Sequence, residues 1–459
     1  MTRLRWGLAV LAWFSCVWFG SWELNPNNAT RLFAAISIVE QHDATIDEFA
    51  ALTIDKAQFD GHAYLDKAPG MTLMAVPAVA LADAVTGARA DPAGVDFAAY
   101  LRLRLRIAVA IGPAVLTALA AVALFELGLG LTGSAGAALF AALGFALGTP
   151  VWGWSTTIFG HAAVAALFVI ALWAVTRDRP MLAGLALGFA VTVEYQAVLA
   201  GGVLALFGLW RWWGRRRLIV AAAIGGVAGL VPLLGYNLFA FGTPFRIAYA
   251  GVQGFEGMHQ GLFGLTSPSP RALWEILFGT RRGLLWVAPV LVLAVPGLAD
   301  LIAARRTRGI GLAAVGAAVV MLLVNAAYVY WDGGNSTGPR HAMPATGLIA
   351  LGLAPFWAAL QAGGRRIAAG VLAASVALNL MIAGCDVFAV PTDHWQLGWV
   401  AREHLFRGDV TSIASDYAGW PDWSGFAIWA LVALPLIGWL VRQARLHPAG
   451  PRVRTFASA

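Results

Sequence analysis

The chain has 459 residues, of which 59% are hydrophobic and 12% are charged, and its mean hydropathy is +0.72. This composition excludes a soluble globular protein and is typical of a polytopic membrane protein. The net charge of +7 does not indicate nucleic-acid binding, because many arginines stand in short clusters between hydrophobic segments, where they act as topology signals. These arginine clusters are Arg211 with Arg215, Arg216 and Arg217; Arg305, Arg306 and Arg308; Arg365 and Arg366; and Arg442, Arg445, Arg452 and Arg454.

Hydrophobic segments long enough to be candidate membrane spans follow one another along the whole chain, since a span needs about 20 apolar residues. They lie near residues 4–19, 70–85, 107–127, 134–149, 161–175, 181–199, 200–210, 218–234, 284–302, 310–330, 342–359, 367–383 and 426–441. We therefore expect an all-α polytopic fold with about 12 or 13 transmembrane helices in a single domain, 1–459. The first segment has no small-residue cleavage site and is expected to be an anchor rather than a signal peptide.

The arginine clusters predict the orientation of these spans in a bacterial cytoplasmic membrane. With the clusters and the N-terminus in the cytoplasm, residues 23–69, 237–283, 331–341 and 386–424 form extracytosolic loops. The segment between Arg106 and Trp152 then contains one crossing too many. Either one hydrophobic block there is re-entrant, or one boundary is misplaced.

The first loop, residues 23–69, holds both lysines of the chain, Lys56 and Lys67, each in an Asp-Lys-Ala tripeptide. It also holds eight of the 24 acidic residues. An ammonium group beside a carboxylate suits a site that binds phosphate while the carboxylate accepts a proton. The alternative is a solvated loop that kept two lysines by chance.

Two further features of this loop precede the second hydrophobic segment. An amphipathic helix is expected over residues 30–41, lying in the membrane interface with Leu32, Phe33, Ile36 and Val39 facing the bilayer. The stretch of Tyr64, Asp66, Lys67 and Pro69 then leads into the segment at 70–85.

On these features, residues 1–85 resemble the first extracytosolic loop of the GT-C superfamily. These are membrane glycosyltransferases that use polyprenyl-phosphate sugars, and they include protein O-mannosyltransferase-like and aminoarabinose transferase-like enzymes. Beyond residue 85 the resemblance rests on the number of spans and on the loops that gather at one face. It implies transfer of a sugar from a polyprenyl-phosphate donor to a lipid, glycan or protein acceptor of the cell envelope, with membrane lipid as a further partner.

The sequence departs from this family at one position that matters for catalysis. Asn27 and Asn28 stand where the family carries an acidic pair, and an amide cannot act as a general base. Either the base has moved to another carboxylate of the loop, with Asp66 and Asp55 the leading candidates and Asp47 a third, or the protein has lost transferase activity.

Candidates for the other roles come from the same predicted face. A leaving phosphate needs cations, and Lys67, Lys56, Arg340 and Arg282 are candidates, although arginines at span edges can also be simple interfacial anchors. Side chains that could contact sugar or acceptor are His62, Tyr64, His161, Gln253, Glu256, His259 and His341. No cofactor is expected, and no cysteine or histidine spacing indicates a metal site. Glu194 lies within an apolar span, which makes it a functional candidate.

Two other classes of function compete with a transferase. A transporter or flippase of a lipid-linked substrate would explain the many spans, but transporters usually show paired halves, and no internal symmetry is visible. A catalytically inactive scaffold would explain Asn27 and Asn28. The concentration of polar residues on one predicted face favours the transferase.

Overall fold

The structure is a computed structural model and describes residues 1–20 and 22–447. Its first elements are α1 (Thr2–Trp18), α2 (Pro26–Ile36), the π-helix η1 (Ser37–Gln41), the 3₁₀ helix η2 (Asp47–Leu52), β1 (Ala57–Phe59), β2 (His62–Tyr64), α3 (Gly70–Thr86), α4 (Phe97–Ile111) and α5 (Pro113–Thr132). The central helices are α6 (Ala135–Ala146), α7 (Val151–Trp154), α8 (Gly160–Thr176), α9 (Pro180–Val193), α10 (Ala197–Arg211) and α11 (Arg216–Phe241).

The C-terminal half continues with short 3₁₀ helices between longer α-helices. These elements are η3 (Ala248–Gly251), η4 (Glu256–His259), α12 (Pro270–Leu277), α13 (Leu284–Val287), η5 (Pro289–Leu293), α14 (Ala294–Ala303), α15 (Arg308–Ala327), η6 (Arg340–Ala345), α16 (Thr346–Ala350), α17 (Leu353–Ala359), α18 (Ala362–Cys385), α19 (Gln396–Glu403), η7 (Leu405–Arg407), α20 (Ile413–Ala418) and α21 (Ser424–Arg445).

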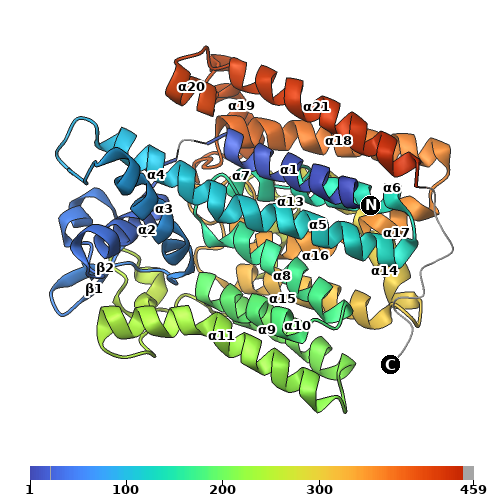
Figure 1. Cartoon of the computed structure of the whole chain (residues 1–459), viewed down its shortest axis with the longest axis horizontal. Helices are drawn as coiled ribbons and strands as arrows, with labels where there is room; N and C mark the ends of the chain where they lie inside the picture. Colours follow the sequence, from blue (N-terminus) through green and yellow to red (C-terminus); the bar gives the residue numbers. More distant parts are fainter. Residues whose placement is uncertain (21, 448–459) are drawn as a thin grey trace.

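The long helices lie roughly along one direction and form a bundle, which confirms the predicted all-α membrane fold (Figure 1). Among the described residues, six helices are long and apolar enough to cross a membrane, and six more apolar helices are shorter. The two strands pair as an antiparallel hairpin, in which Ala57 faces Tyr64, and single bridges join Ala57 to Val252 and Tyr64 to Thr45. Asp60 and Gly61 turn this hairpin with φ values of 51° and 89°, the left-handed conformation that tight hairpin turns require.

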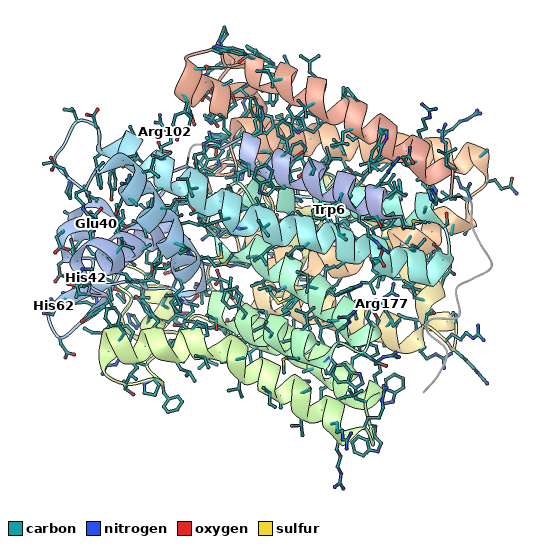
Figure 2. The ribbon with its side chains drawn as sticks, in the orientation of Figure 1. Trp6, Glu40, His42, His62, Arg102 and Arg177 are labelled. Atoms are coloured by element: carbon teal, nitrogen blue, oxygen red, sulfur yellow. The ribbon has the colours of Figure 1, made fainter. Side chains whose placement is uncertain are left out.

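The connections that carry the predicted arginine clusters gather at one end of the bundle. Arg5 Nε of α1 lies 2.7 Å from Glu126 Oε1 of α5, and Arg177 Nη2 after α8 lies 3.3 Å from Glu126 Oε2. Figure 2 shows Arg177 toward this end and Glu40, His42 and His62 at the opposite end. The long polar loops therefore share the end that is opposite to the arginine clusters.

The segment at 70–85, which the sequence predicted as a span, does not carry the chain to the arginine-bearing end. α3 packs against α2 and α4. Just beyond its C-terminus, Ala90 N donates to Glu40 Oε2 at 3.1 Å, and Glu40 belongs to the first loop. Both ends of α3 thus lie beside that loop, so this span prediction is wrong. The residues of α3 are apolar because protein buries one face, and removing this crossing resolves the surplus crossing noted above.

The predicted interfacial helix is also placed differently. It begins at Pro26 and continues beyond Ile36 as the π-helix η1. Leu32, Phe33 and Ile36 are buried inside the protein, where the ring of Phe33 stacks on Phe49 with centroids 4.6 Å apart. The prediction that these side chains face the bilayer is wrong, because an amphipathic pattern marks an apolar face without showing whether lipid or protein covers it.

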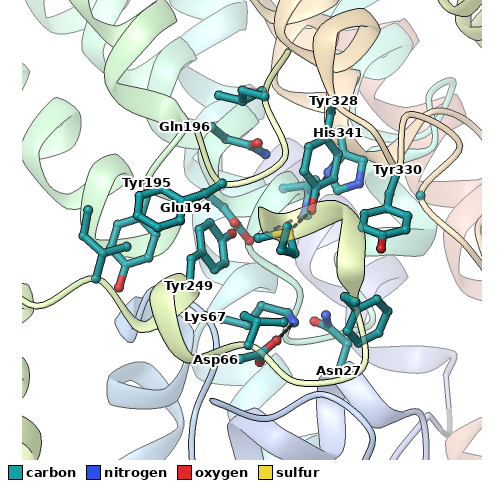
Figure 3. Close-up of a pocket in the computed structure, with 18 of the residues that line it drawn as sticks. Asn27, Asp66, Lys67, Glu194, Tyr195, Gln196, Tyr249, Tyr328, Tyr330 and His341 are labelled. Carbon is teal, nitrogen blue, oxygen red and sulfur yellow. Dashed lines mark hydrogen bonds and ion pairs between the residues drawn. The ribbon is translucent and has the colours of Figure 1, made fainter. Parts of the chain in front are cut away.

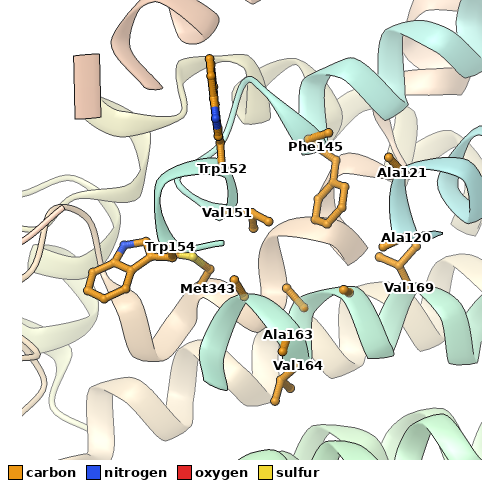
Figure 4. Close-up of a cluster of buried hydrophobic side chains, with 14 of the residues drawn as sticks. Ala120, Ala121, Phe145, Val151, Trp152, Trp154, Ala163, Val164, Val169 and Met343 are labelled. Carbon is orange, nitrogen blue, oxygen red and sulfur yellow. The ribbon is translucent and has the colours of Figure 1, made fainter. Parts of the chain in front are cut away.

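A buried core of small and aromatic side chains supports the region between α5, α6, α7 and α8 (Figure 4). Alanines such as Ala120, Ala121 and Ala163 allow close helix packing. Trp152 and Trp154, which belong to α7, fill the space around that short helix. Trp154 Nε1 also donates to the carbonyl oxygen of Thr337 at 3.2 Å. The core is therefore joined directly to the 331–341 turn, from which Arg340 and His341 extend.

Candidate functional site

A cavity of about 450 Å³ lies between the first loop, the end of α9, residues 247–265 and the 331–341 turn. One part of its wall is polar and consists of Asn27, Arg31, Asp55, Asp66, Lys67, His161, Glu194, Arg340 and His341. The remainder is mainly apolar and aromatic. The cavity brings together segments that are separated by more than 300 positions in the sequence.

Lys67 is shared by two carboxylates in this cavity. Its Nζ makes a hydrogen bond and ion pair with Asp66, drawn in Figure 3, and lies 3.5 Å from Asp55 Oδ2. Asp66 is 1% exposed, and its Oδ1 makes no hydrogen bond among the described residues. The flanking side chains of Leu65 and Ala68 are fully buried, which fixes the Asp66-Lys67 dipeptide just before α3 begins.

The two carboxylates differ in their readiness to hold a proton. Burial raises the pKa of Asp66, and the attraction of Lys67 does not offset it. Burial also acts to raise the pKa of Asp55, but Lys67, Arg340 and the hydrogen bond from Asn27 together bring it below its usual value. Asp55 therefore keeps its negative charge more readily than Asp66 does. Such a separation is typical of paired acids with different roles.

Asn27 and Asn28 have different surroundings. Asn27 Nδ2 donates to Asp55 Oδ2 at 3.1 Å, and its Oδ1 accepts from Arg31 Nη1. Asn28 is fully buried, donates to the carbonyl oxygen of Trp22 at 3.0 Å and accepts from Ile158 N at 3.1 Å. Asn27 thus lies in the cavity beside a carboxylate, whereas Asn28 links the first loop to the segment before α8.

A second cluster of polar side chains, His161, His341 and Glu194, lines the same cavity. His161 Nε2 and His341 Nδ1 are 2.9 Å apart, and His161 Nδ1 is 3.6 Å from Glu194 Oε1. Glu194 also pairs with Arg31 at 3.2 Å. A Cβ on Gly160, the first residue of α8, would clash with the Glu194 carboxylate, so glycine permits this close approach at a helix N-terminus.

Several polar atoms of the cavity have no hydrogen-bond partner within the part of the chain that the structure describes. They are Arg31 Nε, Asp66 Oδ1, His161 Nδ1, Arg340 Nε and His341 Nε2. Arg340 makes no ion pair with another described residue, and its guanidinium lies 5.2 Å from the centre of the Phe159 ring. Buried polar groups are normally hydrogen-bonded, so this gathering of unpaired atoms indicates a site for a polar ligand.

The loop at 247–265 contributes apolar side chains to the opposite wall. Its lining residues are Ile247, Tyr249, Val252, Phe255, Met258, Leu262, Phe263 and Leu265. Gln253, Glu256 and His259, the sugar-binding candidates of the sequence analysis, are exposed and do not line the cavity. This loop therefore suits contact with a hydrocarbon better than contact with a sugar.

The other candidates divide between the cavity and its surroundings. Asp55, Asp66, Lys67, His161, Arg340 and His341 come together in the cavity, while Asp47, Lys56, His62, Tyr64 and Arg282 do not line it. Lys56 Nζ donates to the carbonyl oxygen of Ala50 at 2.5 Å, and His62 Nδ1 contacts Asp47 Oδ2 at 2.6 Å on the surface. The ring of Tyr64 lies 5.0 Å from that of Phe241.

Arg282 has a structural environment. Its guanidinium is fully buried and donates to the carbonyl oxygens of Asp332 at 2.8 Å, Gly334 at 2.6 Å and Ala389 at 3.4 Å. Arg282 thereby joins the 331–341 turn to the loop at 386–424. Burial lowers the pKa of Arg282 to about 10.

Arg31, Tyr249, Tyr328 and Tyr330 also line the cavity and were not predicted from the sequence. A signal was present for Arg31, which follows Asn27 by four positions and so lies on the same face of a helix. The three tyrosines had no distinguishing pattern. In the described residues, no group of three or more His, Cys, Asp or Glu side chains is arranged to hold a metal ion.

The helical bundle, with its long polar loops at one end, defines an all-α polytopic membrane protein. The structure is similar to two crystal structures of ArnT from Cupriavidus metallidurans. One was determined with bound undecaprenyl phosphate (TM-score 0.55) and the other in the apo state (TM-score 0.53), both at 15% sequence identity. In both comparisons 99% of this chain is covered, with 75% and 74% of the respective ArnT chains.

No family model matches the sequence. No curated protein matches it either.

Proposed function

We propose that this protein is a membrane glycosyltransferase that moves a sugar from a polyprenyl-phosphate donor to a cell-envelope acceptor. The observation that carries the proposal is the composition of the cavity wall, where the cations Lys67 and Arg340 share the polar part with the carboxylates and residues 247–265 form an apolar part. A polyprenyl phosphate has the same two parts, an anionic headgroup and a hydrocarbon chain. The ArnT-like fold supports the proposal, because one of the two ArnT structures holds undecaprenyl phosphate.

The unpaired polar atoms suggest how the roles divide. Arg340 and Lys67 bind the phosphate and stabilise the charge that develops on it as the sugar leaves. Asp55 is the general base that accepts the proton of the attacking acceptor hydroxyl, and Asn27 orients it through the 3.1 Å hydrogen bond. His341 presents its unpartnered Nε2 toward the sugar, and His161, between His341 and Glu194, orients it. In this assignment the base is not at position 27 but is Asp55, which accepts a hydrogen bond from Asn27.

The cavity lies at the end of the bundle that carries the long loops, so transfer takes place outside the cytoplasm. The arginine connections at the opposite end, including Arg5 and Arg177, then lie in the cytoplasm, in agreement with the positive-inside rule. In the proposed orientation the reaction occurs at the outer face of a bacterial inner membrane, where nucleotide sugars are absent and lipid-linked sugars are the available donors.

The direct test is binding of undecaprenyl phosphate to the purified protein in nanodiscs, followed by mass spectrometry of envelope glycans and lipids with and without the gene. Micromolar binding that Arg340→Ala weakens at least tenfold, together with loss of one sugar modification in the deletion strain, is the expected result. Arg308→Ala, at the arginine-bearing end, is the matched control and should bind normally.

The competing functions give different outcomes in the same experiments. A transporter would change the distribution of a lipid-linked substrate between the two membrane faces without changing which glycans are present. An inactive scaffold would keep its cellular phenotype when Asp55 and Lys67 are both replaced by alanine.

A further inference from the structure

Acidic and basic side chains are equally numerous in the cavity wall. The carboxylates are Asp55, Asp66 and Glu194, and the cations are Arg31, Lys67 and Arg340. With all six ionised, their charges cancel. A donor with one phosphodiester group would bring a further negative charge among these mostly buried side chains, where an uncompensated charge is costly.

Asp66 is the carboxylate that depends most on Lys67. It is 1% exposed, its hydrogen bond to a side chain comes from Lys67, and its Oδ1 is unpartnered among the described residues. Asp55 has further support, because it keeps the hydrogen bond from Asn27 when Lys67 moves away. Glu194 keeps its ion pair with Arg31 at 3.2 Å.

We propose that a phosphodiester headgroup takes Lys67 from Asp66, and that Asp66 then binds one proton from the solvent. This inference rests on the proposed function, because it requires the headgroup to reach Lys67. No covalent bond changes: the headgroup adds one negative charge, the proton adds one positive charge, and the Asp66 carboxylate becomes a neutral carboxylic acid.

Among the charged and titratable groups around Asp66, Asp55 favours the neutral acid, whereas Arg31 favours the carboxylate. Lys67 and Asp55 belong to the same loop, and Arg31 acts on Asp66 from α2. Across the cavity, the negative charges of Asp66 and Glu194 both act on Tyr195, Tyr249 and Tyr328. Once the phosphate occupies Lys67, the negative charges of Asp55 and of the phosphate itself disfavour an ionised Asp66. Asp66 therefore becomes the neutral member of the group, and Asp55 remains ionised and able to act as the base.

The experiment is isothermal titration calorimetry of the purified full-length protein in nanodiscs with farnesyl methyl phosphate. This probe is a phosphodiester and has no proton of its own that titrates near neutral pH. Measurements in two buffers with different ionisation enthalpies give the number of protons bound per ligand. We expect wild type to take up close to one proton at its most responsive pH, and the affinity to fall by up to about tenfold per pH unit between the Asp66 pKa of the free protein and that of the complex.

Two variants locate the proton. Asp66→Asn should bind the probe without proton uptake and with an affinity that no longer changes with pH. The matched control is Asp60→Asn, since the Asp60 side chain is 91% exposed and asparagine tolerates its φ of 51°. Uptake by this control should equal that of wild type. If Asp66→Asn does not fold, Asp66→Glu keeps the carboxyl group and should retain the uptake.

The outcomes separate this inference from the proposed function. Probe binding by wild type without proton uptake, or uptake that persists in Asp66→Asn, overturns the role of Asp66 and leaves the proposed donor site intact. Absence of any binding by wild type overturns both.

Discussion

Asn27 donates a hydrogen bond of 3.1 Å to the carboxylate of Asp55, which lies 28 positions further along the chain. The same amide accepts from Arg31 through its oxygen, so both of its polar atoms are used. An aspartate at position 27 could not donate to Asp55, and two carboxylates at this distance would not both ionise readily. The amide at position 27 and the carboxylate at position 55 are therefore complementary.

Exchanging these two side chains tests whether Asp55 is the base. Asp55→Asn should lower transfer by about 10²- to 10⁴-fold, the usual contribution of a general base. The double variant Asn27→Asp with Asp55→Asn restores one amide and one carboxylate with their positions exchanged, and should recover at least part of the lost rate. The measurement is turnover of a lipid-linked sugar donor by purified protein. Asp55→Asn with undiminished turnover would remove Asp55 from the mechanism.

The two lysines should respond differently to removal. Lys67→Ala takes away a cation that meets two cavity carboxylates, and it should reduce turnover by about 10²- to 10³-fold, as loss of one transition-state donor does. Lys56→Ala is the matched control, because Lys56 contacts the carbonyl oxygen of Ala50 outside the cavity. Equal losses for both variants, measured at equal protein levels, would contradict the placement of the phosphate beside Lys67.

The buried pair of Arg31 and Glu194 makes a prediction about stability. Glu194→Gln leaves the Arg31 guanidinium, which is 1% exposed, without its ionised partner. The expected cost is about 3–5 kcal/mol of unfolding free energy, seen as a lower midpoint of thermal unfolding in detergent. The double variant Arg31→Gln with Glu194→Gln removes both charges and should be less destabilised than Glu194→Gln. A double variant that is less stable than either single variant would show that the two charges act independently.

The loop at 386–424 should open more easily as the pH rises. Burial raises the pKa of Asp386 to about 6, above its ordinary value of 3.8, although His404 Nε2 lies 3.3 Å from the carboxylate. A raised acid pKa means that the folded loop binds more protons than the open loop. Its stabilising contribution is therefore complete below about pH 4 and is lost as the pH rises to about 6.

Hydrogen exchange across residues 386–424, corrected for the intrinsic rate, measures this effect. Protection in wild type should decrease between about pH 4 and pH 6, and Asp386→Asn should remove that part of the pH dependence because it has no titrating proton. A mutant with the wild-type pH profile would assign the effect to another group.

The amino-acid sequence by itself determined the membrane class, the end of the bundle to which the arginine clusters belong, and the proximity of Asp66 to Lys67. These properties depend on composition and on neighbouring positions. The sequence could not show that α3 stays beside the first loop or that Phe33 is covered by protein, because hydropathy measures exclusion from water and is the same for lipid and for a protein interior. Only the tertiary structure places His161 within 2.9 Å of His341, 180 positions away, and Asn27 beside Asp55. Such contacts depend on how distant helices pack, and no local pattern encodes them.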